Sequence, residues 1–509
     1  MTGRRRRVSG SLAETARKNG TNIWRDVLPE RAKPLRGMDR PPLPMPTTPF
    51  VLLCHNQQQV EAALREGNYD AVFPSGRNCF DEIVAFLVST GVFGLFKLFR
   101  FKREREGIPD QLTIRVLLTA VLLRCPSIRK IPEVLFRDHG VLRFLGFNAH
   151  TLAVGFNKRG GDGKELPFSH ETVYDLWGEE RLDEESVGEV ARAYFRSLFV
   201  QRLVRGTTYV LDGTSLIAGK TRKLLMVLLN ARGGRELITG YRIRPEKKKP
   251  EEQQEAELSL GKGMVRAALK AGAQIKQLIV DRAYIDGAWM RELVGLGIDL
   301  LVRVKEDMQI FADLEGHGRA KDAAWKEKEV VRKIEGRQVR YRVRLLLVKQ
   351  LESWDSYRGP LTGLLVDLTP LEGPKAGETK RMALVTPREY DDPWVMWGHW
   401  CMRWRIENSG NRELKEGFLL EKGLWSDHPT AVALSVLLRV IAYNTFRLYV
   451  SKQGQGWVIR GLRELHREVF AKGGLFVVVE ADGCFGVFSV VEFAHLLGKP
   501  PRLQGRHPP

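Results

Sequence analysis

The sequence has few cysteines, no long hydrophobic run and no histidine pair at metal-ligand spacing. Its 5 cysteines among 509 residues are scattered and include no Cys-x-x-Cys pair, which argues against a zinc ribbon and against a disulfide framework. The longest apolar stretches, residues 83–96 and 431–438, are shorter than the ~18 residues needed to span a bilayer. No apolar core follows the basic start at residues 4–7, so we expect neither a secretory signal nor a membrane partner. These absences predict a protein of a reducing compartment, the cytoplasm.

The composition is typical of a folded protein with a large positive charge. Hydrophobic residues make up 43% and charged residues 28% of the chain, as in globular proteins, and the length is enough for roughly three domains. Lysine and arginine number 81 against 61 acidic residues, which leaves a net charge of +20. Such an excess favours a partner that carries phosphate, with a membrane surface as the competing interpretation.

Changes in composition and periodicity divide the chain into six regions. They are a flexible basic arm at 1–46, a mainly helical region at 47–205, an α/β region at 206–307, a β-rich insertion at 308–385, a mainly helical region at 386–450, and a C-terminal segment with a β-hairpin at 451–509. The arm has two open interpretations, a solubilising tail and a segment that contacts phosphate directly.

The α/β region has a regular order of predicted elements. They are strands at 207–211, 224–229 and 237–243, a helix at 256–271, a strand at 278–280, a helix from 286 and a strand at 300–304. Short glycine-containing turns join the first three strands, so an antiparallel meander is expected. The order is therefore β-β-β-α-β-α-β.

Carboxylates end two of these predicted strands. Asp212 follows the first strand and Asp281 follows the strand at 278–280, so both are expected at one edge of the sheet. Two close carboxylates repel each other unless a divalent cation neutralises them, and oxygen ligands suit magnesium or manganese. Glu407 is the candidate for a third ligand, with Arg403 one helical turn earlier.

Each of these residues also has a purely structural interpretation. Asp212 precedes a glycine and fits a turn, and Glu407 with Arg403 fits a surface ion pair. Asp286, before Gly287, is predicted to cap a helix and is left out of the site.

The three blocks together resemble a known family. Leu-Asp-Gly-Thr-Ser at 211–215, Ile-Val-Asp-Arg-Ala-Tyr-Ile-Asp at 279–286 and Arg-Trp-Arg-Ile-Glu-Asn at 403–408 resemble bacterial insertion-sequence transposases with an Asp-Asp-Glu triad. The subgroup is the one with a Tyr-x2-Arg-x3-Glu-x6-Lys signature and a β insertion before the glutamate. The resemblance covers residues 205–450.

The resemblance implies a fold, a chemistry and a set of partners. The fold would be α/β, with a ribonuclease-H-like catalytic core in two parts, 206–307 and 386–450, interrupted by the β-rich insertion and preceded by a mainly helical DNA-end-binding region. Asp212, Asp281 and Glu407 would bind two Mg²⁺ ions, with Mn²⁺ as a substitute. The partners would be double-stranded DNA, both element ends and target, and a second copy of the chain in a homodimeric DNA complex. The location would be the bacterial cytoplasm, associated with the nucleoid.

Three further residues correspond to the signature, two of them with a departure. Arg403 and Lys415 would hold DNA phosphates. Trp400 occupies the tyrosine position, where it would pack on DNA or in a tryptophan-rich core. Lys415 lies eight residues after Glu407 instead of seven, which on a regular helix would turn it ~80° away from Glu407. We therefore predict a π-bulge near Ser409 and Gly410 that absorbs the extra residue.

The function implied is a transposase that binds terminal inverted repeats, cleaves them and joins the ends to target DNA. Two alternatives stay open. One is a catalytically inactive or co-opted DNA-binding relative, and the other is a ribonuclease-H-like nuclease without strand-joining activity.

Overall fold

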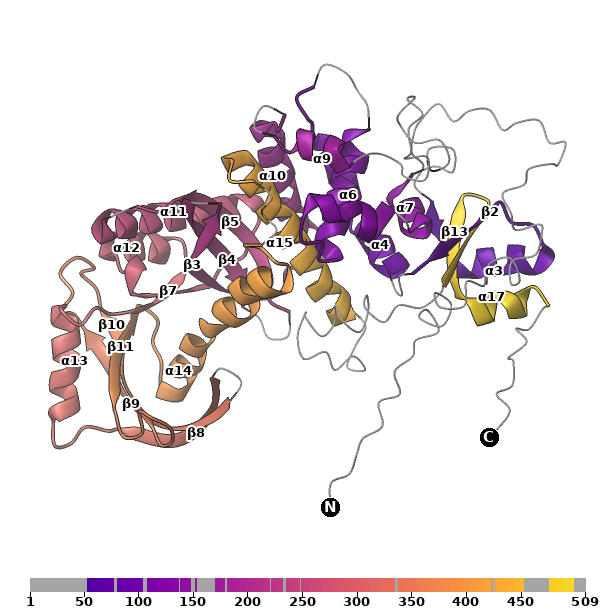
Figure 1. The fold of residues 1–509 in the computed structure, drawn as a ribbon. Helices are drawn as coiled ribbons and strands as arrows, with labels where there is room; N and C mark the ends of the chain where they lie inside the picture. The colour runs from indigo at the N-terminus through magenta and orange to yellow at the C-terminus, as the bar shows by residue number, and fades with distance from the viewer. Residues whose placement is uncertain are drawn as a thin grey trace. The chain divides into compact units, whose positions relative to one another are not determined.

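The computed structural model shows a mixed α/β protein (Figure 1). It describes residues 53–498 apart from 77–79, 104–107, 137, 148–151, 153–169, 179–180, 220, 232–234, 248, 335–336, 423, 425 and 453–475. The predicted basic arm at 1–46 lies outside the described residues. The chain divides into two compact units, one formed by 191–416 and the other by the residues up to Val190 together with those from Gly417 onward.

The 191–416 unit begins with the predicted order of elements. They are β3 (Thr208–Ala218), β4 (Thr221–Asn230), β5 (Leu237–Pro245), α11 (Pro250–Ala271), β6 (Gln277–Val280), α12 (Gly287–Gly295) and β7 (Asp299–Arg303). The meander is confirmed, because β4 pairs antiparallel with both β3 and β5. β6 is parallel to β3 and to β7. All four residues of β6 are buried, as is usual for a parallel strand covered on both faces.

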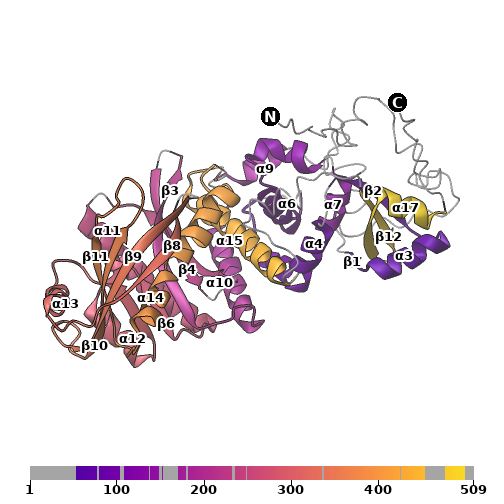
Figure 2. The same ribbon diagram turned by 90° about the horizontal axis from the view of Figure 1, so that it is seen from below.

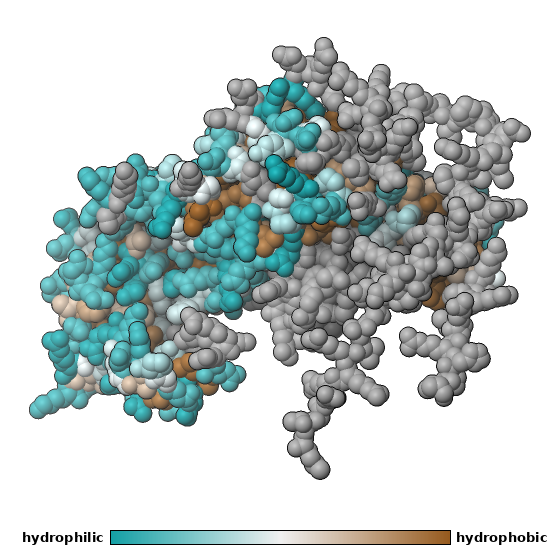
Figure 3. All heavy atoms as spheres, in the orientation of Figure 1, coloured by the Kyte–Doolittle hydropathy of each residue, from teal (hydrophilic) through white to brown (hydrophobic). Residues whose placement is uncertain are grey.

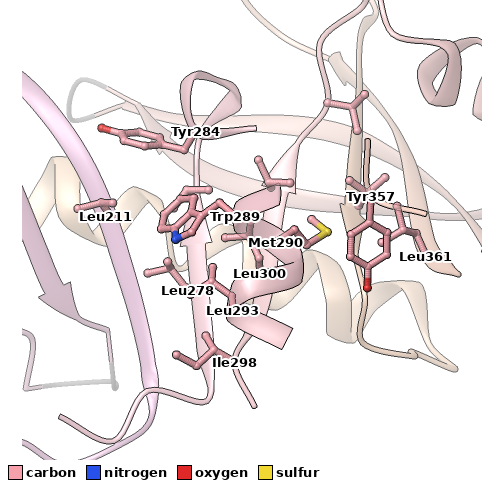
Figure 4. Packing of buried hydrophobic residues seen from close by; sticks show 14 of the residues in the cluster. Leu211, Leu278, Tyr284, Trp289, Met290, Leu293, Ile298, Leu300, Tyr357 and Leu361 are labelled. Atoms are coloured by element: carbon pink, nitrogen blue, oxygen red, sulfur yellow. The ribbon is translucent and has the colours of Figure 1, made fainter. Parts of the chain in front are cut away.

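One hydrophobic cluster fixes the helices on this part of the sheet. Leu211, Leu278 and Leu300 come from β3, β6 and β7, and Trp289 of α12 is 2% exposed among them (Figure 4). The apolar residues of α11 pack on the same cluster. Burial of these apolar side chains stabilises the strand ends that carry the candidate site residues.

The 308–385 segment is rich in strands, as predicted. Its elements are α13 (Gln309–Arg319), β8 (Lys326–Ile334), β9 (Arg337–Leu351), β10 (Leu361–Pro370) and β11 (Lys380–Thr386). They are not a separate unit, because β11 pairs antiparallel with β7 and the sheet has the order β5-β4-β3-β6-β7-β11-β10-β9-β8. The strands β8 to β11 are labelled in Figure 2. Without β11, one edge of β7 would have unpaired backbone hydrogen-bonding groups. The pairing of β7 with β11 joins distant parts of the chain and has no local sequence signal. α13 was not predicted. Over these strands and α13, the face in Figure 3 is mostly hydrophilic.

The second unit is built from both ends of the chain. Its helices include α4 (Phe80–Ser89), α6 (Asp110–Leu122), α7 (His139–Leu145) and α15 (Pro429–Lys452). A four-stranded sheet has the order β1-β13-β12-β2, formed by β1 (Cys54–His55), β13 (Cys484–Ser489), β12 (Phe476–Ala481) and β2 (Ala71–Ser75). The predicted C-terminal hairpin is confirmed as β12 and β13, with Asp482 and Gly483 both at positive φ in the turn.

Among the described helices, only α15 is long and apolar enough to cross a membrane by length and composition. Within its most apolar window, 89% of the residues are buried inside the protein. This is the environment of a helix in a protein core.

Candidate active site

The two aspartates follow a pair of neighbouring residues in the sheet. The parallel ladder between β3 and β6 ends with Leu211 opposite Val280, and Asp212 and Asp281 are the next residues on their strands. Asp212 does not end β3, contrary to the prediction, because the strand continues to Ala218 in antiparallel pairing with β4. What ends at Asp212 is the pairing with β6, so both carboxylates stand where these two strands part.

Local hydrogen bonds hold each aspartate. The Asp212 carboxylate accepts from its neighbour's backbone, Gly213 N, at 2.9 Å. The Asp281 carboxylate accepts from Arg282 N at 2.7 Å and caps the 3₁₀ turn Arg282–Tyr284. Asp286 caps α12 by accepting from Trp289 N at 2.6 Å, so its predicted structural role is confirmed.

Arg403 joins Asp212 to Glu407. It lies between α14 (Pro393–Cys401) and a π-helical segment, Ile406–Asn411, which contains Glu407. Arg403 Nη1 is 2.7 Å from Glu407 Oε1 and 3.7 Å from Asp212 Oδ2. Its guanidinium carbon is also 5.4 Å and 5.8 Å from the ring centroids of Trp400 and Trp404. Glu407 is therefore more than one end of a local ion pair, because its partner also contacts a strand almost two hundred residues away.

The electrostatics bring the third carboxylate into the same site. Burial is the main cause that raises the pKa of Asp212 to about 7. Arg403 and the Gly213 hydrogen bond oppose this rise, while Glu407 and Asp281 add to it by like-charge repulsion. Asp281 and Glu407 thus both lie within electrostatic reach of Asp212.

A fourth carboxylate and a tyrosine accompany the triad, and neither was predicted. Burial raises the pKa of Tyr284 well above its ordinary value, and Asp212, Glu257 and Asp281 raise it further. Glu257 lies on α11 and is half-buried. No sequence signal distinguishes Glu257 from the other glutamates of that helix. It lies near the site because α11 packs beside the 3₁₀ segment Arg282–Tyr284.

A cavity of about 530 Å³ opens beside Asp281. It is lined by Gln254 and Glu257 of α11, by Arg282, and by Lys305 after β7. Lys305 Nζ donates to Gln254 Oε1 at 3.3 Å. The cavity is at the carboxyl ends of the parallel strands β6 and β7, which is where α/β sheets usually bind ligands.

The predicted helix irregularity is confirmed. Ser409 and Gly410 lie inside the π-helical segment Ile406–Asn411, and a second π-helical segment covers Glu413–Gly417. Lys415 lies in the second segment and donates from Nζ to the Ser215 carbonyl oxygen at 2.6 Å. Ser215 is three residues after Asp212 on β3, so the late lysine still reaches the strand that carries the first aspartate.

Trp400 is 3% exposed and packs inside the protein, as its core interpretation predicts. Contact between Trp400 and DNA stays a prediction, and in this conformation the more accessible tryptophan beside Arg403 is Trp404, at 37%.

The residue types at this site, although not their spacing in this structure, suit a divalent cation. Among the described residues, no three His, Cys, Asp or Glu side chains are close enough together to bind a metal ion. The carboxylates of Asp212, Asp281 and Glu407 are the hard oxygen donors that Mg²⁺ prefers, and their mutual repulsion is what such an ion offsets. Arg403 is the cation that lies against two of them, Asp212 and Glu407.

Comparison of the sequence with protein-family models finds no match, and comparison with curated proteins finds none either. The functional argument therefore depends on the motifs and on the geometry of this site.

Proposed function

We propose that this protein is a DNA transposase with an Asp-Asp-Glu active site on a ribonuclease-H-like core. It would bind the terminal inverted repeats of an insertion sequence, cleave them by metal-dependent phosphodiester hydrolysis and join the ends to target DNA. The observation that carries the proposal is the meeting of the three motifs. Asp212 and Asp281 follow paired residues of β3 and β6, and Arg403 links Asp212 to Glu407.

The sheet supports a ribonuclease-H-like core. Three antiparallel strands, β5, β4 and β3, continue into the parallel strands β6 and β7, with α11 and α12 in the connections. The chain then returns through β8 to β11 before the segment with Glu407, which matches the position of a β insertion before the glutamate.

The residues have distinct roles in this proposal. Asp212, Asp281 and Glu407 would hold two Mg²⁺ or Mn²⁺ ions, with Asp212 shared. When bound, such ions activate water, and later a 3′-hydroxyl, and stabilise the leaving oxygen of the scissile phosphodiester. Arg403 and Lys415 would orient the DNA backbone, Arg403 through a two-pronged contact and Lys415 as a point charge. Asp212 must lose its proton to act as a ligand, and because its pKa is raised to about 7, the metal-free site is mostly ionised only above that pH.

The partners follow from the reaction. Two element ends must be cut, so a homodimer on double-stranded DNA is expected, and a DNA-bound protein of a bacterial cell would be associated with the nucleoid. The net charge of +20 supports a polyanionic partner.

A plasmid assay tests the proposal. A supercoiled plasmid that carries the DNA flanking the gene is incubated with Mg²⁺ and the full-length wild-type protein, Asp212→Asn or Asp286→Asn. The second variant is a matched control, because Asp286 caps α12 and asparagine caps helices equally well. We expect wild type and Asp286→Asn to cut at inverted repeats and to join the ends to a second plasmid, and Asp212→Asn to do neither.

Other results would favour the alternatives. Cutting that needs Asp212 but never yields joined products would indicate a nuclease. Retarded DNA on a gel without cuts in Mg²⁺ or Mn²⁺ would indicate a DNA-binding relative and would refute the catalytic proposal.

A further inference from the structure

Arg403 occupies an unusual position for a residue expected to hold DNA. Its Nη1 atom contacts Glu407 Oε1 at 2.7 Å and lies 3.7 Å from Asp212 Oδ2, so the cation is directed into the carboxylate cluster. Its side chain is only 12% exposed. In this arrangement the guanidinium neutralises the same two carboxylates that the proposed function assigns to divalent cations.

We infer that Arg403 is a built-in counter-ion that competes with the divalent cation for Asp212 and Glu407. When a DNA phosphate binds the Arg403 guanidinium, this competition ends. The inference rests on the proposed function and adds to it a coupling between metal binding and DNA binding.

Charge repulsion is the reason for the competition. A guanidinium within hydrogen-bond distance of Glu407 and a dication on the same carboxylate repel each other at short range, where solvent screens poorly. The dication has the higher charge and would be held by all three carboxylates, whereas the guanidinium contacts two of them. Metal entry therefore requires that Arg403 turns away, and the cost of losing its carboxylate contacts lowers the apparent metal affinity.

The surroundings of Arg403 allow it to change partners. Its Nε atom is buried and, among the described residues, has no hydrogen-bond partner. The guanidinium therefore has unused donor capacity while it contacts the carboxylates. The Trp400 and Trp404 rings, on either side along the chain, can retain cation-π contact with the guanidinium after the carboxylates release it.

A phosphate is the partner that uses this capacity best. Arginine binds a phosphate with two parallel N–H donors, which would also satisfy Nε. Once Arg403 holds a phosphate, Asp212 and Glu407 are left with uncompensated negative charge, and their affinity for a dication rises. Because coupling free energies are reciprocal, the dication must raise the DNA affinity by the same factor.

Direct measurement of Mn²⁺ binding tests this inference without relying on activity. Free Mn²⁺ is titrated by electron paramagnetic resonance against the full-length protein, with and without a short duplex, and the ions bound by the duplex alone are subtracted. The proteins are wild type, Arg403→Gln, Arg403→Lys and Arg412→Gln. Arg412 is the matched control, because it directly follows the π-helical segment Ile406–Asn411 and pairs with Glu416 on the exposed surface.

The expected result is a difference between DNA-free and DNA-bound affinity that depends on Arg403. Without DNA, Arg403→Gln should bind Mn²⁺ about 10-fold more tightly than wild type, and Arg412→Gln should match wild type. DNA should tighten Mn²⁺ binding about 10-fold in wild type and little in Arg403→Gln. If Arg403→Gln does not fold, Arg403→Lys serves in its place, because lysine is shorter and lacks the two-pronged contact, and we expect a smaller tightening in the same direction.

Two outcomes overturn the inference in distinguishable ways. If wild type binds Mn²⁺ at a site that Asp212→Asn removes, but Arg403→Gln has equal or weaker affinity, the competition is refuted and the proposed function stands. If no Mn²⁺ site depends on Asp212 even with DNA present, the metal site of the proposed function fails, and this inference fails with it.

Discussion

Lys415 donates a hydrogen bond from Nζ to the Ser215 carbonyl oxygen at 2.6 Å. This contact ties the second π-helical segment, Glu413–Gly417, to β3 at a point three residues beyond Asp212. An ammonium group carries three N–H donors, so the contact with β3 does not by itself exclude a contact with phosphate.

Replacing Lys415 should therefore weaken DNA binding without unfolding the protein. We expect Lys415→Gln to reduce the slope of log affinity against log salt by about one, because one phosphate contact is lost. The measurement is fluorescence anisotropy of a labelled duplex over a range of salt concentrations. Arg319→Gln is the control, since Arg319 is an exposed cation that pairs with Glu315 on α13. An unchanged slope in Lys415→Gln would contradict the phosphate contact.

Two glycines of α11 should respond in opposite ways to alanine. A Cβ at Gly261 would lie 2.7 Å from Leu211 Cδ2 and 3.3 Å from Tyr284 Cε1, whereas a Cβ at Gly263 meets nothing within 4 Å. We expect Gly261→Ala to lower the free energy of unfolding by about 1–3 kcal/mol through overpacking. Gly263→Ala should raise it by up to about 1 kcal/mol through helix propensity. Urea unfolding measures both, and equal effects would show that α11 does not approach β3 this closely.

Asp212→Asn should stabilise the metal-free protein in a pH-dependent way. Burial raises the pKa of Asp212 from 3.8 to about 7. Between these values the folded state holds a proton that the unfolded state has lost, so wild-type stability falls as the pH rises from 4 to 7 and then levels off. Asparagine does not ionise and avoids this loss. We expect Asp212→Asn to have a Tm several degrees above wild type at pH 8, and a much smaller difference at pH 4.5.

The measurement is thermal unfolding in EDTA at both pH values. Asp286→Asn is the control, because it makes the same chemical change at an aspartate that caps α12, a position that asparagine also fills well. A Tm difference for Asp212→Asn that is the same at pH 4.5 and pH 8 would contradict the burial of the Asp212 carboxylate.

A buried ion pair joins distant segments in the unit that contains both chain ends. Arg143 of α7 and Glu480 of β12 are paired, with side chains 6% and 8% exposed. Removing one partner leaves a buried charge, so we expect Arg143→Met to cost about 3–5 kcal/mol of unfolding free energy. The double variant Arg143→Met with Glu480→Leu should recover much of that loss.

An exposed pair provides the comparison. Lys130 and Glu133 are three residues apart and both about half exposed, so Lys130→Met should change the unfolding free energy by at most about 0.5 kcal/mol. Chemical denaturation measures all of these variants. Equal effects of Arg143→Met and Lys130→Met would show that the β12 hairpin does not pack on α7.

The sequence by itself determined the features that depend on local patterns. Alternating and helical periodicity predicted the order of elements from β3 to β7, and Asp-Gly predicted the turn of the C-terminal hairpin. The eight-residue spacing between Glu407 and Lys415, compared with the seven of the signature that the sequence resembles, predicted the π-helical irregularity, because an extra residue within a helix must be absorbed near the place where it occurs. The three motif positions were also visible, since each depends on its immediate neighbours.

Only the tertiary structure decided which distant groups meet. The extension of the sheet through the pairing of β11 with β7, the approach of Arg403 to Asp212, and the orientation of Glu257 toward Tyr284 all join parts of the chain that share no local signal. The same holds for the buried pair of Arg143 and Glu480. Periodicity specifies which face of an element is buried, but the partner of that face is selected by packing and hydrogen bonding over the whole fold. For this reason the three candidate carboxylates and Arg403 could be named from the sequence, whereas the approach of Arg403 to Asp212 could only be seen in the folded chain.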